Sequence, residues 1–143
     1  MKKLLLSIFF VSSLATSQVY QTFSMHFVRV EGDLEAFEKV QTMYMQKVAQ
    51  NSVEKGDIAF WAFLKRIGMD NIDDEKKKNY LFVQSNKDVT AMLSDKNRWW
   101  ENAPNVLSKE EQELVAALEK SYSWTEDSRH IFVDEISIAK GLG

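Results

Sequence analysis

The order of elements along the chain predicts an α+β fold of the type β-α-β-β-α-β, a split βαβ pattern with an extra helix before the last strand. Three observations predict it. Residues 20–30 alternate between apolar and more polar side chains, as a half-buried strand does. Residues 34–53 carry apolar side chains at helical spacing. Two short runs of aromatic and aliphatic residues, 58–67 and 79–84, follow that helix and are typical of paired strands.

Asp33 is predicted to begin the first helix. It follows the glycine that ends the first strand, and aspartate is a preferred N-cap residue. Lys55 and Gly56 indicate where the helix stops. The apolar stripe of this helix consists of Leu34, Phe37, Val40, Tyr44 and Val48.

The second helical stretch is expected to begin after Asn86, which can cap it. It is expected to end at Ala103 and Pro104, because the residue before a proline avoids the α region. Trp99 and Trp100 continue its apolar stripe and are predicted to pack in the core.

Ser108 and Glu111 match a capping box, which predicts the extra helix over residues 109–122. The last strand is expected over residues 131–138. Its alternation of apolar residues slips, and either a bulge near Asp134 and Glu135 or an imperfect pattern accounts for this.

The first 17 residues have the three regions of a secretory signal peptide. Two lysines form the positive start, residues 4–14 are mostly apolar, and Ala15 and Ser17 are the small residues that a signal peptidase recognises. Cleavage after Ser17 would leave residues 18–143 as one domain, periplasmic or extracellular if the host is bacterial. The alternative is an uncleaved anchor or a first core helix. No later segment is long and apolar enough to be expected to span a bilayer.

The composition limits the classes of function. The chain has no cysteine, which excludes disulfides and thiolate chemistry. Its hydrophobic content of 45% predicts a packed core rather than disorder. The formal net charge is −3, and removal of the leader lysines makes the domain more acidic. We therefore expect no binding to nucleic acid.

The predicted sheet has more apolar surface than one layer of helices can cover. In a ferredoxin-like sandwich, two helices cover one face of the sheet and the other face is open. Here the strands at 58–67 and 79–84 are apolar on both faces, so the open face would be a large apolar patch. Either a second copy of the chain, packed sheet to sheet, or the extra helix at 109–122 is expected to cover it.

The chain resembles the dimeric α+β barrel superfamily, which includes antibiotic-biosynthesis-monooxygenase-like and stress-responsive barrel domains. The resemblance is carried by strand 20–30 with the helix capped at Asp33, by the strand pair 58–67 and 79–84, and by residues 85–92 entering the second helix. It lies in element order and not in a diagnostic motif. It implies a homodimer, and functions that range from cofactor-independent oxygenases and haem-degrading enzymes to domains without known activity.

Three residues are candidates for binding a ligand. His26 and Ser24 lie on the less apolar face of the first strand, which is expected to line the space between two sheets. If the first and last strands pair antiparallel, Asp134 or Glu135 could lie beside His26, and such a pair can transfer a proton or orient a ligand. Trp61 could stack on a flat aromatic ligand. The alternative for these residues is ordinary core or interface packing.

Two further residues are weighed for a role. His130, at the expected start of the last strand, could join His26 and a carboxylate in a metal site. No close spacing of metal ligands supports one, so neither a metal nor a cofactor is predicted. Trp124 precedes the expected strand and could be a lid or a simple anchor.

The sequence thus predicts an exported domain that binds a small apolar or aromatic ligand or a partner. It contains no glycine-rich phosphate loop and no hydrolase elbow, so whether it is an enzyme stays open. The alternative is a cofactor-independent monooxygenase or a haem-processing enzyme, based on the resemblance together with His26 and Trp61. A third possibility is a structural domain whose apolar sheet face serves only association.

Overall fold

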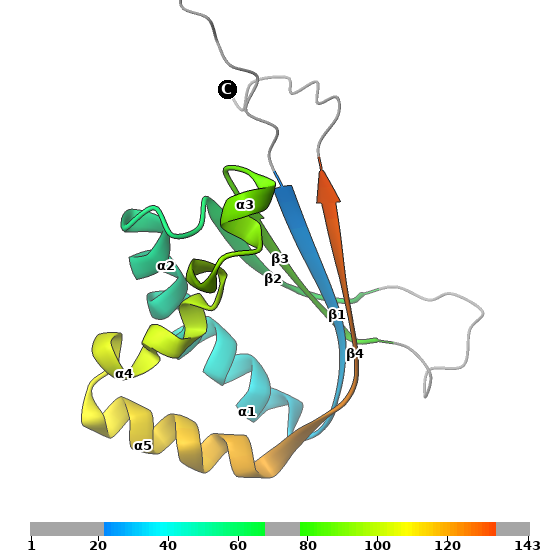
Figure 1. The fold of residues 1–143 in the computed structure, drawn as a ribbon. Helices are drawn as coiled ribbons and strands as arrows, with labels where there is room; N and C mark the ends of the chain where they lie inside the picture. Colours follow the sequence, from blue (N-terminus) through cyan, green and yellow to red (C-terminus); the bar gives the residue numbers. More distant parts are fainter. Residues whose placement is uncertain (1–21, 68–77, 134–143) are drawn as a thin grey trace, which may run out of the picture.

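The computed structural model describes residues 22–67 and 78–133. Within them, four antiparallel strands form one sheet in the order β2-β3-β1-β4. The helices of these residues lie on one side of the sheet, which gives two layers (Figure 1). The predicted α+β class and the split βαβ order are confirmed. The strands are β1 (Thr22–Gly32), β2 (Phe60–Lys65), β3 (Tyr80–Asn86) and β4 (Tyr122–Val133).

The first helical segment begins and ends where the sequence predicts. The Asp33 side chain accepts a hydrogen bond from the Ala36 backbone N–H at 3.0 Å. Gly56, with φ of +75°, follows the last turn. One turn in the middle widens into a π-helix, so the segment has three parts: α1 (Leu34–Lys39), η1 (Val40–Met45) and α2 (Gln46–Glu54). The buried residues of the predicted stripe are Phe37, Val40, Tyr44 and Val48.

The second helical stretch is not the continuous helix that the sequence predicted. Asp88, and not Asn86, caps its first turn, because the Asp88 side chain accepts from the Ala91 N–H at 2.7 Å. Asn86 still belongs to β3, where its buried amide donates to the Asp57 carbonyl at 3.0 Å. The stretch is divided into α3 (Val89–Met92), the 3-10 turns η3 (Asp95–Asn97) and η4 (Trp99–Asn102), and α4 (Ala103–Val106).

Pro104 lies in the first turn of a helix, where the sequence analysis expected it to end one. It stands at the start of α4, where no intrahelical hydrogen bond needs its missing N–H. The next helix, α5 (Lys109–Leu118), begins with the predicted capping box: Glu111 N–H donates to Ser108 Oγ at 3.2 Å and Ser108 N–H to Glu111 Oε2 at 3.0 Å. An ion pair between Lys47 and Glu111 joins α5 to α2.

The last strand begins at Tyr122 and not near Ile131 as predicted. Its first half carries acidic and basic side chains, which an edge strand tolerates because much of its surface faces water. A 3-10 turn, η5 (Glu119–Ser121), links it to α5. Pairing with β1 shifts register between Arg29 and Val30, which marks a bulge. The bulge expected near residues 134–135 lies outside the described residues.

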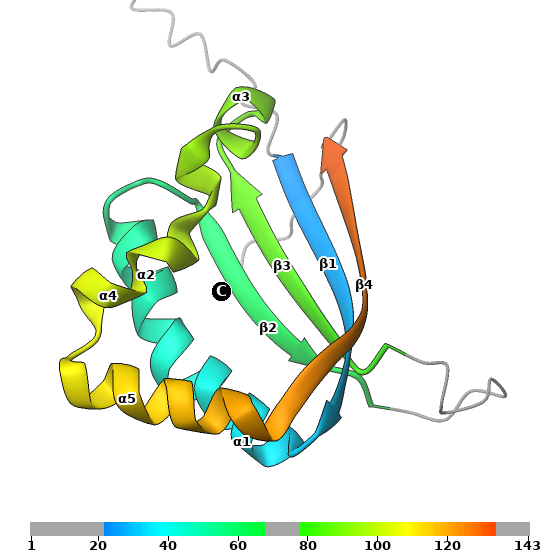
Figure 2. The same cartoon turned by 60° about the horizontal axis from the view of Figure 1, so that its bottom comes forward.

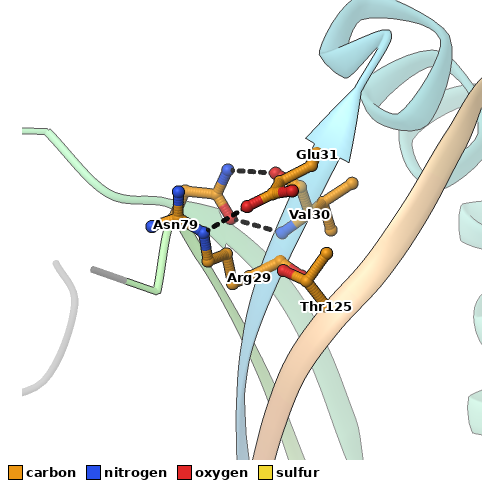
Figure 3. Close-up of polar contacts among 5 residues, drawn as sticks. All are labelled: Arg29, Val30, Glu31, Asn79 and Thr125. Atoms are coloured by element: carbon orange, nitrogen blue, oxygen red, sulfur yellow. Dashed lines mark hydrogen bonds and ion pairs between the residues drawn. The ribbon is translucent and has the colours of Figure 1, made fainter. Parts of the chain in front are cut away.

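Asn79 extends the sheet with its side chain where the β1–β3 ladder ends. Its amide accepts from the Val30 N–H and donates to the Val30 carbonyl, both at 2.9 Å (Figure 3). On the same stretch of β1, Arg29 Nε donates to Glu31 Oε1 at 2.8 Å, and the Thr125 hydroxyl of β4 donates to the Arg29 carbonyl at 3.4 Å. The backbone of β1 therefore keeps hydrogen-bond partners on both sides at the bulge, and these partners are side chains of the neighbouring segments.

The face of the sheet away from the helices is apolar, and no helix of the described residues covers it (Figure 2). Helix α5 lies in the helical layer, so the extra helix does not cover this face, which answers one of the two alternatives weighed from the sequence. Phe60, Leu64 and Phe132 are 48%, 46% and 49% exposed. We call this surface the open face; by strand register it comprises Phe23, Met25, Phe27, Phe60, Ala62, Leu64, Leu81, Val83, His130 and Phe132.

Candidate functional site

A cavity of about 520 Å³ lies between the sheet and the helical layer. Its volume is in the range of small-molecule pockets, about 300–1,000 Å³. The aromatic side chains that line it are Trp61, Phe82, Trp99, Trp100 and Trp124. The polar and charged ones are Ser24, His26, Gln41, Gln84, Glu119, Asp127 and Arg129.

The three residues predicted to bind a ligand all line this cavity: His26 and Ser24 from β1, and Trp61 from β2. The expected place of the cavity was wrong, because these side chains face the helices and not a second sheet. Val28 shares their face of β1 and packs against Phe37 of α1, which turns the whole face toward the helical layer.

Five rings form a continuous panel along the cavity. Phe82 and Trp124 are stacked, with centroids 5.7 Å apart and planes at 7°. The His26 imidazole lies 6.2 Å from Phe82 and 5.8 Å from Trp124. Trp61 lies 6.3 Å from Phe82 and meets Trp99 edge-on at 5.6 Å. Trp124, considered a lid or an anchor from the sequence, is part of the wall.

His26 contacts a carboxylate of β4, that of Asp127, which the sequence analysis did not name. Its Nε2 lies 3.2 Å from Asp127 Oδ2. Asp134 and Glu135, the partners considered from the sequence, lie outside the described residues. A neutral imidazole that donates from Nε2 to Asp127 keeps Nδ1 as a proton acceptor. The arrangement can therefore accept a proton or a hydrogen bond from a molecule in the cavity.

The sequence analysis missed five polar cavity residues, among them Arg129 and Gln41. Arg129 of β4 donates from Nε to Ser24 Oγ at 2.7 Å and from Nη2 to Met92 Sδ at 3.8 Å. Gln41 of η1 is 7% exposed, and its amide has no hydrogen-bond partner among the described residues. A signal for Gln41 was present, since it lies four residues after Phe37 and so on the buried helix face. Arg129 was hidden because its strand was not recognised.

A buried amide network holds the roof of the cavity to the sheet. Gln84 of β3 accepts from Trp99 Nε1 at 3.0 Å and donates to Asn86 Oδ1, also at 3.0 Å. Its amide also donates to Asn97 Oδ1. Because all four side chains are buried, these bonds fix the irregular turns η3 and η4 and confirm that Trp99 packs in the core. Trp100, also predicted as core, is 42% exposed.

Hydrogen bonds and burial shift the pKa values of titratable groups near the cavity. Hydrogen bonds from Lys65 and Tyr80 lower the pKa of Glu38 and tie α1 to β2 and β3. Burial, with the charge of Glu119 adding to it, raises the pKa of Tyr122 to about 12. Glu119 lines the end of the cavity where β4 begins.

The metal site considered from the sequence does not form. His130 is inside β4 and belongs to the open face, with its ring 6.1 Å from Phe27 and 6.2 Å from Phe132, whereas His26 faces the cavity. No group of three or more metal-ligating side chains occurs in ranges 22–67 and 78–133. In the same ranges, no helix has the length and apolar character needed to cross a membrane.

The chain is similar to several solved structures. A dimeric ferredoxin-like protein from an uncultured marine organism has a TM-score of 0.51 at 7% identity, over 87% of this chain and 95% of that chain. The fold of this chain is therefore ferredoxin-like. A variant of SnoaB, a cofactor-independent oxygenase from Streptomyces nogalater, has a TM-score of 0.43 at 15% identity, over 85% of this chain and 99% of that chain. HapK from Hahella chejuensis has a TM-score of 0.43 at 14% identity over the same shares.

The likeness to these structures concerns the fold alone, since one fold hosts many activities. No family model matches the sequence. No curated protein matches it by sequence. A function is therefore argued from the cavity and the open face.

Proposed function

We propose that this protein is an exported homodimeric domain that binds a small planar aromatic molecule in the cavity between its sheet and its helices. The observation that carries the proposal is the aromatic panel formed around Trp61, Phe82 and Trp124, which leaves ring faces along a cavity of about 520 Å³. Mostly apolar walls with a few polar groups are the usual composition of ligand pockets. A flat ring stacks on such walls, and His26 offers it a hydrogen bond.

Ligand binding is tested by calorimetric titration of the purified protein with 6-hydroxy-2-naphthamide, a neutral planar probe. Trp61→Leu removes a ring from the panel and is expected to weaken binding at least about tenfold. The control is Phe60→Leu, because Phe60 is the neighbouring residue of β2 on the open face. No binding by the wild type, or equal losses in the two variants, contradicts the proposal.

The open face supports the homodimer, because its exposed apolar side chains are those that a second sheet would cover. Leu64→Asp would place an unpaired carboxylate in that interface, which is unfavourable by several kcal/mol. We expect light scattering to find a dimer for the wild type and a monomer for this variant. Leu114→Asp is the control, since Leu114 is 53% exposed on α5 in the helical layer. A monomeric wild type would show that the open face does not mediate self-association.

Export is supported by the three-part leader at residues 1–17. Expression of the full sequence in a bacterial host is expected to yield, in the periplasm or the medium, a chain whose mass corresponds to a start at Gln18. Recovery of a chain that retains the leader and stays in the cell would contradict both the cleavage and the location.

A second candidate function is a cofactor-independent oxygenase, and the contact between His26 and Asp127 favours it. A base beside the ring panel could remove a proton from C10 of an anthrone. The carbanion would reduce O₂ and form a C10 hydroperoxide with the returned proton, and loss of water from it would leave the quinone. We expect O₂ uptake with anthrone to be lost in His26→Ala if this candidate holds. Uptake that is absent in the wild type, or unchanged in the variant, removes it.

The haem-processing alternative would depend on His26, the histidine that lines the cavity among the described residues. Because Nε2 already contacts Asp127, iron ligation would have to use Nδ1. A shift of the Soret band in a haem titration, lost in His26→Ala, would support this alternative. A titration without a shift would remove it.

A further inference from the structure

We propose that the ligand of this cavity is an aromatic acid, whose carboxylate binds Arg129 and whose hydrogen-bonding substituent meets Gln41. The inference rests on the proposed binding function and names the chemical class of the ligand. Neither residue follows from the fold likeness. Both are chosen because they have hydrogen-bonding groups without a partner among the described residues, in a cavity that is otherwise largely aromatic.

The Arg129 guanidinium is held in place but not neutralised. It extends from β4 across β1, where buried Ser24 accepts from Nε at 2.7 Å and buried Met92 receives Nη2 at 3.8 Å. A guanidinium has five N–H donors, so three remain for a ligand. No carboxylate pairs with Arg129 in the described part of the chain. A planar cation fixed in this way matches a carboxylate with two parallel hydrogen bonds.

The other charges around the cavity leave this cation available. Asp127 is next to His26, at 3.2 Å. Glu119 lies at the opposite end, where it raises the pKa of Tyr122. Tyr122 and Arg129 are seven steps apart along β4, which corresponds to roughly 20 Å. Arg129 therefore attracts an acidic group and Glu119, at the other end, repels it, which favours one orientation of a bound acid. Asp127, two residues before Arg129 on the same face of β4, reduces this attraction and does not reverse the orientation, because Glu119 has no cation beside it among the described ion pairs.

Gln41 faces the same cavity from the helical layer. It is 7% exposed, and its amide donor and acceptor have no partner among the described residues. The amide atoms are not sealed off by protein, since they do not belong to the enclosed unpartnered atoms of the described residues, and they are therefore open to the cavity. A ligand hydroxyl or carbonyl can pair with them. Gln41 lies on the π-helical turn η1, a feature that is frequent at functional sites. The sheet and the helical layer thus each contribute one polar contact.

Three matched probes test the proposal by calorimetry on the purified protein. 6-Hydroxy-2-naphthoate has both groups, 6-hydroxy-2-naphthamide lacks the charge, and 2-naphthoate lacks the hydroxyl. We expect the wild type to bind the hydroxy acid at least about tenfold more tightly than the amide, because hydrogen bonds between charged groups are the stronger ones. This preference is expected to weaken as salt increases.

The variants assign the two preferences to the two residues. Arg129→Gln should abolish the preference for the acid, because it weakens binding of the acid much more than binding of the amide, while Arg129→Lys should retain part of the preference. Gln41→Leu should abolish the preference for the hydroxyl. Arg98→Gln is the control, because Arg98 pairs with Glu101 on the surface outside the cavity.

The outcomes separate this proposal from the one on which it rests. Equal affinity of the wild type for acid and amide overturns the inference and leaves the aromatic binding function standing. An Arg129→Gln variant that loses affinity for all probes alike also overturns the inference, because it indicates that the arginine is purely structural. Absence of binding by every probe overturns the binding function and the inference together.

Discussion

Phe82 of β3 and Trp124 of β4 stack with their planes at 7°, although β1 lies between their strands. The bulge opposite Arg29 and Val30 makes this contact possible. On the C-terminal side of the bulge in β4, odd-numbered residues such as Asp127 face the cavity. On its N-terminal side, the even-numbered Trp124 pairs with Val30 and also faces the cavity. Without the extra residue, the Trp124 ring would point to the open face.

The Trp124 ring is expected to contribute to stability as well as to the cavity. It contacts the rings of His26, Phe37 and Phe82, at 5.8, 5.7 and 5.7 Å. Trp124→Ala should lower the free energy of unfolding by about 2 kcal/mol in urea denaturation. Trp100→Ala is the matched control: Trp100 has similar exposure and one edge contact, with Trp99, so a smaller loss is expected. Equal losses would show that the stack adds nothing to stability.

Asn79 should be required for the end of the β1–β3 pairing. Asn79→Leu leaves the N–H and the carbonyl of Val30 without their side-chain partner, which should reduce the free energy of unfolding by about 2 kcal/mol. Hydrogen exchange of the Val30 amide is expected to accelerate. Asn105→Leu serves as control, because the Asn105 amide bonds only to nearby Asn102 at the surface. Unchanged exchange at Val30 would contradict this role.

The two glycines with positive φ should differ in their tolerance of alanine. A Cβ at Gly32 would lie 2.5 Å from the Ser121 carbonyl oxygen, which is fixed because it accepts from the Asp33 N–H at 3.0 Å. A Cβ at Gly56 would meet nothing within 4 Å. Gly56→Ala is therefore expected to lower the free energy of unfolding by about 1 kcal/mol, because only the unfavourable positive φ contributes and no steric clash is added. Gly32→Ala should lose clearly more in urea denaturation, and equal losses would argue against the close contact.

The carboxylate of Glu38 should make stability depend on pH at the acidic end. Its pKa is lowered in the folded state by hydrogen bonds from Lys65 and Tyr80. Stability from this group is therefore present above the pKa of the unfolded chain, about 4.3, and is lost as pH falls through the lower folded pKa. In urea denaturation, Glu38→Gln should be less stable than the wild type at pH 7, and the difference should shrink toward pH 3. A constant difference would contradict the assignment.

Local rules predicted the elements whose ends carry specific side chains. The Asp33 cap and the capping box of Ser108 and Glu111 were visible because each satisfies backbone groups within its own turn. The strand pair β2–β3 was visible because both strands are apolar. Pro104 misled the prediction, since one proline is compatible with the end of one helix or the start of the next.

The rest depends on contacts between distant segments. Asp127 and Arg129 lie before the last strand as the sequence predicted it, because the charged side chains of an edge strand hide the strand pattern. Their contacts with His26 and Ser24 follow only from the register of β4. The segment after β3 is divided into short turns because Gln84 binds Trp99 and Asn97, a network that no local pattern indicates. The side of the sheet that the helices cover was likewise set by tertiary packing.

The sheet order has a consequence for when the molecule can fold. Strand β1 is synthesised first, yet its two neighbours in the sheet are β3 and β4, and β4 is the last described strand of the chain. Thr22 pairs with Val133, so the ladder between β1 and the edge strand β4 must close a loop of about 110 residues, which slows folding. Until β4 emerges, β1 lacks one of its partners. The complete sheet can therefore form only after Tyr122–Val133 has been synthesised, so the chain has to remain without its native sheet until then.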